Sequence, residues 1–302
     1  MGRGSMSDEA EALRAIMSEP LWLCAMGFLF GALVGSFLNV VIYRLPLDES
    51  VVFPPSHCPG CDAAIKPWDN IPLISYILLG AKCRQCKIHI SLRYPAVELL
   101  TAVVFAAIAM RFGPSLETLI FVVFAAGLIV AGLIDVDHQI IPDEVSLGGL
   151  VLGLVAVPSW MVYSGDPVSV ALMHSFVGAL LGGGMLWIVG FGHARFCVAM
   201  GREFEHWPGE GESIPRPSEA DYWMWFPGMG FGDVKLLAMI GAFVGPVGVV
   251  TTVLLASVLG LLSGCAWALA TRSWNSPFGF GPAIASAALL SLFLPDPLFL
   301  IR

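Results

Sequence analysis

The sequence is poor in charge. Only 13% of its 302 residues are charged, against about 25% in ordinary soluble domains, and 57% are hydrophobic. This balance excludes an ordinary soluble protein. No cluster of Lys and Arg resembles a nucleic-acid-binding patch, so no nucleic acid is expected as a partner. The net charge of −8 says little about partners, because the acidic residues concentrate in two tail-like or loop segments.

Other signatures are missing as well. No cleavable signal peptide is expected, because the first apolar run is too long and continues into a structured motif. Residues 1–5 have the composition of a cloning remnant, with Met6 as the native start, and 1–20 form an acidic lead. The glycine fingerprint of soluble nucleotide-binding folds is absent. No inverted repeat of the kind that builds carriers is obvious.

Long apolar runs dominate instead. About 20 apolar residues are needed to cross roughly 30 Å of hydrocarbon, and the first such run covers 21–43. We therefore predict an all-α polytopic membrane protein in contact with lipid, with about eight transmembrane helices. A membrane core, 95–302, is interrupted by a polar insertion at 192–228. The other expected helices are 95–112, 118–134, 145–163, 168–191, 233–244, 247–271 and 281–295.

The loop 44–94 holds two cysteine pairs, Cys58 with Cys61 and Cys83 with Cys86. Their separation is close to that of a zinc ribbon, and four thiolates at about 2.3 Å make a closed, structural tetrahedral site. The alternatives are disulfides or idle thiols. The loop is basic, hence cytoplasmic and reducing, which argues against disulfides. Cys24, Cys197 and Cys265 are isolated and are interpreted as inert packing residues.

The distribution of basic residues predicts the orientation. With the N-terminus outside, 11 of the 15 Lys and Arg fall in cytoplasmic segments, in agreement with the positive-inside rule. Both acidic motifs then lie at the cytoplasmic edge of the membrane. The eleven are Arg44, Lys66, Lys82, Arg84, Lys87, Arg93, Arg195, Arg202, Arg216, Lys235 and Arg272.

Two carboxylates stand out. Asp135 follows seventeen mostly apolar residues, and Asp233 follows the glycine-rich stretch Gly228 to Gly232. A charge at the bilayer centre costs about 2.5–3.5 kcal/mol and less near the interface, so such a residue is a functional candidate. Two carboxylates about 4 Å apart repel by roughly 4 kcal/mol at an effective dielectric near 20. One therefore stays protonated while the other is ionised, which suits aspartyl proteolysis without a metal.

The neighbouring residues leave alternatives open. Asp137 is either a water-facing loop acid or a support for the carboxylate pair, and His138 is interpreted as a loop or headgroup-facing residue rather than a ligand. Asp143 is interpreted as the N-cap of the next helix. Lys235 is expected to extend toward lipid phosphates. Gly230 and Gly232 would let an extended peptide approach the pair. All but His138 are candidate substrate-binding or site-shaping residues, and Trp223, Trp225 and Tyr222 are interpreted as an interfacial belt.

In this order along the chain, the motifs resemble those of the bacterial prepilin peptidases, or type IV prepilin leader peptidase/N-methyltransferases. The resemblance spans nearly the whole sequence and is highly specific. It rests on Gly35 to Pro46, the two cysteine pairs, Asp135 to Asp143, Gly230 to Gly241, and Pro277-Phe278-Gly279 with Gly281-Pro282, the last carrying two extra residues.

The resemblance implies an intramembrane aspartyl endopeptidase of the GxGD type in the bacterial inner membrane, with Asp135 and Asp233 as its catalytic aspartates. Members of the family cut the basic leader from type IV prepilins, or from type II secretion pseudopilins, after a Gly. Many then methylate the new N-terminus with S-adenosylmethionine. The insertion 192–228 is longer and more acidic than a plain connection. It either covers the site, contacts the leader, or is a solvated loop.

Two other classes of function are weighed against this one. A proton-coupled carrier would use intramembrane acids to relay ions, but here the acids lie at one face of the membrane. A zinc-ribbon scaffold for pilus assembly would need neither aspartate.

Overall fold

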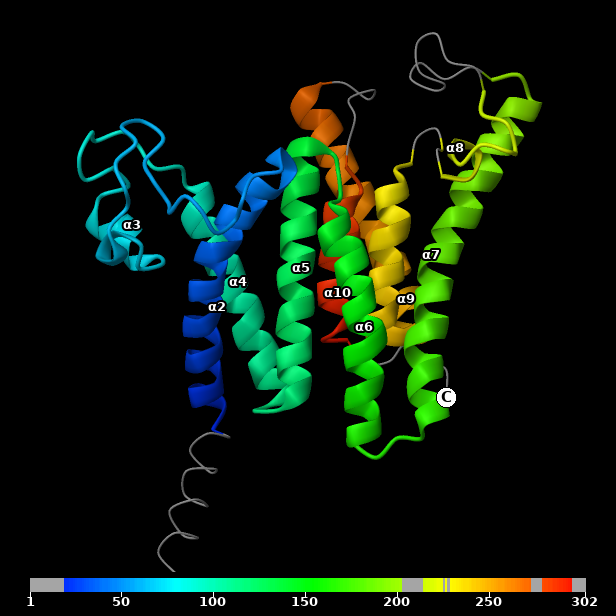
Figure 1. The fold of residues 1–302 in the computed structure, drawn as a ribbon, viewed down its shortest axis with the longest axis horizontal. Coiled ribbons are helices and arrows are strands. Elements are labelled where there is room, and N and C mark those ends of the chain that lie inside the picture. The colour runs from blue at the N-terminus through cyan, green and yellow to red at the C-terminus, as the bar shows by residue number, and fades with distance from the viewer. Residues whose placement is uncertain (1–18, 203–213, 225, 227–228, 273–278, 295–302) are drawn as a thin grey trace, which may run out of the picture. The chain divides into compact units, whose positions relative to one another are not determined.

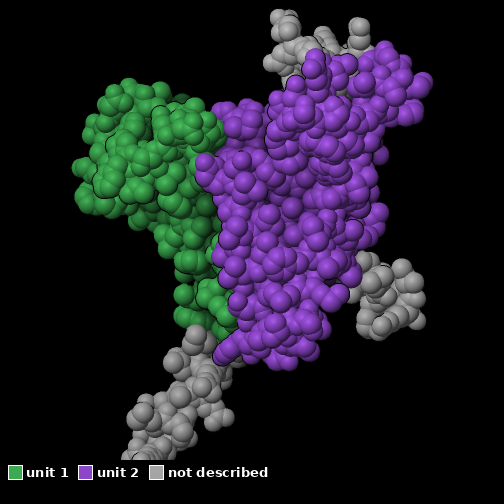
Figure 2. Space-filling model, turned by 45° about the vertical axis from the view of Figure 1, so that its right-hand side comes forward, with its two compact units in different colours: residues 1–130 green, residues 131–302 purple. Residues whose placement is uncertain are grey.

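The computed structural model describes residues 19–202, 214–224, 226, 229–272 and 279–294. Within these, the structure is helical and its β-bridges are isolated. The expectations on the lead 1–18, on Trp225, on Pro277 and Phe278 and on the end of the last helix lie outside the described residues. The chain divides into two compact units, 1–130 and 131–302, which are coloured separately in Figure 2.

The first unit contains α2 (Pro20–Arg44), α4 (Arg93–Phe112) and the segment that joins them. Pro20 stands at the first position of α2, where its missing N–H is not needed. The two helices pack closely through glycines. A Cβ on Gly31 would lie 2.7 Å from Ala102 Cα, and one on Gly35 would lie 2.8 Å from Glu98 Cα. Small residues at such contacts are typical of helix pairs in membranes.

The connecting segment folds around short elements: η1 (Leu45–Leu47), η2 (Pro67–Asp69) and α3 (Ile74–Leu78). We call residues 56–92 the cysteine lobe, since the four paired cysteines lie in it. The lobe is anchored on α4, because the Leu73 N–H donates a hydrogen bond to the carboxylate of Glu98 at 2.7 Å.

The boundary between the two units falls within α5 (Leu116–His138). The second unit continues with α6 (Asp143–Tyr163), α7 (Val168–Ala199), α8 (Asp221–Met224), α9 (Phe231–Thr271) and α10 (Gly281–Ser291). α7 and α9 lie side by side in Figure 1, and Gly178 of α7 packs directly against the Gly241 carbonyl of α9. Buried residues of α9, such as Leu236 and Ile240, contribute to the core of this unit.

α9 is interrupted at Gly245, whose φ of 70° is outside the helical region and which precedes Pro246. The predicted helices 233–244 and 247–271 correspond to the two halves of this element. By length and composition, six helices of the described chain are suited to cross a membrane: α2, α4, α5, α6, α7 and α9. Their outer faces carry exposed apolar side chains, among them Leu180, which is 74% exposed. The polytopic helical fold is therefore present, but a count of eight spans is not shown.

α7 differs from its predicted extent. It continues to Ala199 instead of ending at 191, so the first eight residues of the expected polar insertion are helical. Part of the reason is that Ala194 and Cys197 are buried, which gives this extension an apolar inner face.

Candidate active site and metal centre

Asp135 is a buried carboxylate, 5% exposed, in the last turns of α5. Its Oδ2 accepts a hydrogen bond of 3.0 Å from the backbone N–H of Gly281, the first residue of α10. Gly279 and Gly281 both pack against this side chain, and a Cβ on Gly281 would lie 2.7 Å from Oδ2. The carboxylate is therefore held by backbone that approaches it closely.

Asp233 is the third residue of α9, which begins directly after the extended residue Gly230 (ψ 140°). An acidic residue in this position interacts favourably with the helix dipole. The charge of Asp135 contributes to the electrostatic field at Asp233. The structure thus brings the two predicted carboxylates within electrostatic range in the same unit.

The turn between α5 and α6 and the first residue of α6 each contact the start of α9. A Cβ on Gly232 would lie 3.1 Å from Cβ of Ile141. Lys235 forms an ion pair with Asp143, whose side chain is 57% exposed. The ammonium group of Lys235 therefore has a carboxylate of the protein as a partner, and its extension toward lipid phosphates stays a prediction.

The predicted cap is also displaced by one residue. Pro142 occupies the N-cap position of α6, and Asp143 is the first helical residue. Asp137 and His138 belong to the last turn of α5 rather than to a loop, and both are exposed, as is Gly230.

The aromatic residues before α9 pack on α7. Trp223 stacks on Phe191, with ring centroids 5.2 Å apart, and the Trp187 Nε1–H donates to the Trp223 carbonyl oxygen. Gly190 lets Phe226 and Met229 approach α7, since a Cβ there would lie 2.7 Å from Phe226 Cδ2. Trp223, Phe226 and Met229 therefore hold the chain before Gly230 against α7.

The four paired cysteines come together in the cysteine lobe. Their Sγ atoms all lie within 4.8 Å of one another, with Cys58 to Cys86 at 3.7 Å and Cys61 to Cys83 at 4.0 Å. Four sulfurs around a zinc ion, each at about 2.3 Å, are separated by about 3.8 Å. The donor set and its spacing therefore fit a closed tetrahedral metal site.

Backbone hydrogen bonds shape the lobe for this chemistry. N–H groups of Cys86 and Gln85 donate to the Cys83 thiol and lower its pKa to about 6, which favours the thiolate that binds metal. Each cysteine pair closes a small turn, with Asp62 N–H donating to Cys58 O at 2.8 Å and Lys87 N–H to Cys83 O at 3.1 Å.

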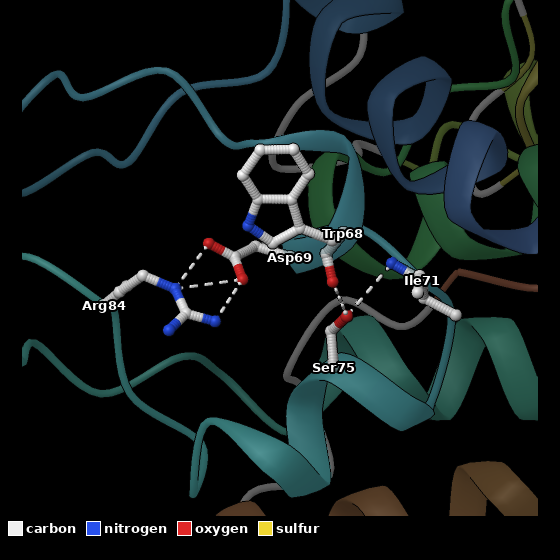
Figure 3. A network of polar contacts seen from close by, with 5 residues as sticks. All are labelled: Trp68, Asp69, Ile71, Ser75 and Arg84. Carbon is white, nitrogen blue, oxygen red and sulfur yellow. Dashed lines mark hydrogen bonds and ion pairs between the residues drawn. The ribbon is translucent and has the colours of Figure 1, made fainter.

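Figure 3 shows the polar contacts that brace the lobe. The Arg84 guanidinium donates to both oxygens of Asp69, at 2.6 Å from Nη2 and 2.8 Å from Nε. This hydrogen-bonded pair lowers the pKa of Asp69. The buried Ser75 hydroxyl donates to Trp68 O and accepts from Ile71 N–H, both at 3.0 Å.

The sequence does not single out two residues that shape these sites. Gly281 stands there only as part of a motif, and its bond to Asp135 joins residues 146 positions apart. Glu98 does carry a signal, since a charged residue inside the apolar run 95–112 is costly.

These observations define the class: a multi-span helical membrane protein with two neighbouring carboxylates and a separate four-cysteine cluster. Residues 29–112 match the family model described as the bacterial peptidase A24 N-terminal domain, and residues 122–265 match that of the type IV leader peptidase family.

Curated relatives match over nearly the full length. The prepilin leader peptidase/N-methyltransferase of Pseudomonas aeruginosa is 34% identical, with 93% of each chain covered. That of Neisseria gonorrhoeae is 34% identical, with 84% of each chain covered. The type 4 prepilin-like proteins leader peptide-processing enzyme of Escherichia coli is 32% identical, over 87% of this chain and 91% of the relative. No solved structure matches the chain.

The chain belongs to the bacterial type IV prepilin leader peptidase/N-methyltransferase family, the A24 peptidases. The resemblance drawn from its motifs is confirmed.

Proposed function

We propose that Asp135 and Asp233 are the catalytic pair with which this chain removes the leader from a prepilin. The observation that carries the assignment is the environment of Asp135. Its carboxylate is buried, is held by the Gly281 N–H, and lies within electrostatic range of Asp233. Buried acids in membrane helices mark functional sites by default.

Two neighbouring carboxyl groups in a partly buried site share one proton. The ionised group takes a proton from a water molecule. The oxygen of this water attacks the carbonyl carbon of the scissile peptide bond at the same time. The protonated group donates to the carbonyl oxygen, so the tetrahedral intermediate carries no full negative charge. Proton transfer to the leaving amine and cleavage of its C–N bond then release the leader.

The substrate follows from the names of the relatives, which process type IV prepilins or prepilin-like proteins. A prepilin, or a pseudopilin of type II secretion, presents a basic leader joined to an apolar helix. The exposed Gly230 at the start of α9 leaves room for an extended peptide beside Asp233. We propose that the cut follows the Gly at this junction.

Methylation of the new N-terminus by S-adenosylmethionine is proposed from the same names alone, and no residue is assigned to that cofactor. Zinc is proposed for the four cysteines, where a closed set of thiolates would serve structure rather than catalysis.

We further propose that the chain lies in the bacterial inner membrane with its N-terminus outside. The cysteine lobe and both aspartates then face the cytoplasm, where the leader is. The bias of Lys and Arg toward these segments supports this orientation.

The test compares Asp135→Asn and Asp233→Asn with the unchanged protein, co-expressed with a prepilin in membranes. Asn keeps the size and removes the ionisable proton, so leader removal is expected to fall about 100-fold or more while the protein still accumulates. Asp166→Asn, an exposed carboxylate in the α6–α7 connection, serves as the control.

Cleavage at the unchanged rate by either variant would refute that residue's assignment, and Asp137 and Asp143 would then be tested in the same way. Cleavage that survives all four substitutions would exclude the aspartyl mechanism.

A further inference from the structure

In the short helix α3 of the cysteine lobe, a polar residue is buried and the large apolar residues are exposed. Its polar residue Ser75 is 5% exposed and hydrogen-bonded within the lobe, as Figure 3 shows. Its large apolar residues point the other way: Ile74 is 54%, Ile77 75% and Leu78 80% exposed. A helix at a water-facing surface has the reverse pattern. The outer face of α3 is therefore made for apolar surroundings.

A hydrogen bond to α4 fixes the position of α3 along that helix. Leu73, the residue before α3, donates its N–H to the Glu98 carboxylate at 2.7 Å. Glu98 is five residues after the first residue of α4, which is about 7.5 Å along the helix axis. α4 is one of the helices suited to cross a membrane. Interfacial helices bury their apolar face about 5–10 Å into the boundary between headgroups and acyl chains, which is comparable to the distance of Glu98 from the start of α4.

The charges around α3 suit the same surroundings. Between residues 64 and 94, five basic side chains stand against one acidic side chain, Asp69, which is already paired with Arg84. Anionic headgroups attract such basic segments. The five are Lys66, Lys82, Arg84, Lys87 and Arg93.

We propose that the outer face of α3, formed by Ile74, Ile77 and Leu78, inserts into the lipid bilayer and anchors the cysteine lobe at the membrane surface. Exposed Lys66 and Lys82 contact lipid phosphates beside it. Lipid is favoured over a protein partner because the basic residues around this face complement anionic headgroups, and because the helix α4 to which α3 is bound carries exposed apolar side chains such as Val103. The inference does not depend on which residues cleave the substrate.

The test places a photo-crosslinking benzophenone side chain at Ile77 of the full-length protein, in nanodiscs of phosphatidylethanolamine and phosphatidylglycerol. Gln85, an exposed residue between two cysteines of the same lobe, receives the same label as the matched control. After irradiation, mass spectrometry counts lipid adducts at each position. We expect at least about fivefold more adduct at residue 77, because only that side chain reaches the acyl chains.

A second label at Leu78 guards against local misfolding at residue 77, and it is expected to give the same excess. Equal adduct yields at residues 77, 78 and 85 would overturn the proposal. With a prepilin added, a crosslink to the prepilin as the main product at residues 77 and 78 would overturn it in favour of a substrate groove. A crosslinked dimer as the main product would overturn it in favour of a contact between two copies of the chain.

Discussion

The carboxylate of Asp135 is enclosed by backbone that leaves no room for a side chain. At Gly281, a Cβ would lie 2.7 Å from Oδ2 and 2.9 Å from Cγ of Asp135. Gly281→Ala is therefore expected to displace the carboxylate and lengthen its hydrogen bond. A misplacement of about 1 Å at a catalytic group can cost about 100-fold in rate, so we expect at least a tenfold loss of leader cleavage in a membrane assay.

Gly148→Ala in α6 is the matched control, because a Cβ there meets nothing within 4 Å. It is expected to cleave at the unchanged rate. If Gly281→Ala folds and keeps full activity, the position of the Asp135 carboxylate does not control cleavage.

The sequence singles out the two aspartates as candidates because a carboxylate at the end of an apolar run is costly and therefore rare. It does not indicate Gly281 as a neighbour of Asp135, since that contact depends on how α10 packs beside the end of α5. The partner of Lys235 was missed for the same reason. The ion pair joins residues 92 positions apart, and no spacing rule links them.

At the scale of elements, the ion pair between Lys235 and Asp143 links the start of α9 to the start of α6. Reversing either charge places like charges together, so Lys235→Asp or Asp143→Lys is expected to lower leader cleavage about tenfold by shifting Asp233. The double reversal restores an attractive pair and is expected to recover most of the activity.

The recovery distinguishes a positioning role from a direct one. Glu144→Lys, at the exposed residue next to Asp143, is the control and is expected to retain activity. If the double reversal is as inactive as the single variants, Lys235 or Asp143 acts through its own charge rather than through the pair.

The contact between α7 and α9 depends on paired glycines. A Cβ on Gly178 would collide with the Gly241 carbonyl, whereas a Cβ on Gly184 of the same helix meets nothing within 4 Å. Overpacking of this kind costs about 1–3 kcal/mol, so Gly178→Ala is expected to lower the free energy of unfolding by about that amount. Thermal unfolding in detergent would measure it, and equal stability of Gly178→Ala and Gly184→Ala would contradict the close approach.

Most helices were predictable at this scale, because a run of apolar residues bounded by Gly or Pro is a strong signal. The Gly245-Pro246 break was predicted, and the structure places a non-helical φ at Gly245. The end of α7 at Ala199 was not predicted, because the residues after 191 are more polar than the rest of the helix and their burial depends on tertiary contacts.

At the scale of the whole molecule, the order of the motifs indicated the family. Several short motifs that follow one another in a fixed order along the chain are more specific than any one of them alone. The division into two units was not evident from the sequence, because the boundary falls inside the apolar helix α5. The orientation in the membrane stays a prediction.

The division predicts how the molecule responds to loss of metal. All four paired cysteines lie in the first unit, whereas Asp135 and Asp233 lie in the second. The lobe has little regular structure to stabilise it without metal, since its helices α3 and η2 have five and three residues. Metal binding to such a segment supplies much of its folding free energy.

Removing zinc with a chelator, or by Cys61→Ser with Cys86→Ser, is therefore expected to raise hydrogen exchange across residues 56–92 at least about tenfold, because those amides lose their fixed turns. Exchange in α9 and α10 should stay unchanged. Cys265→Ser, in α9 and outside the cluster, is expected to leave bound zinc and both exchange patterns as they were. Faster exchange in α9 and α10 after zinc loss would show instead that the two units are stabilised together, and no bound zinc in the unchanged protein would exclude the metal site.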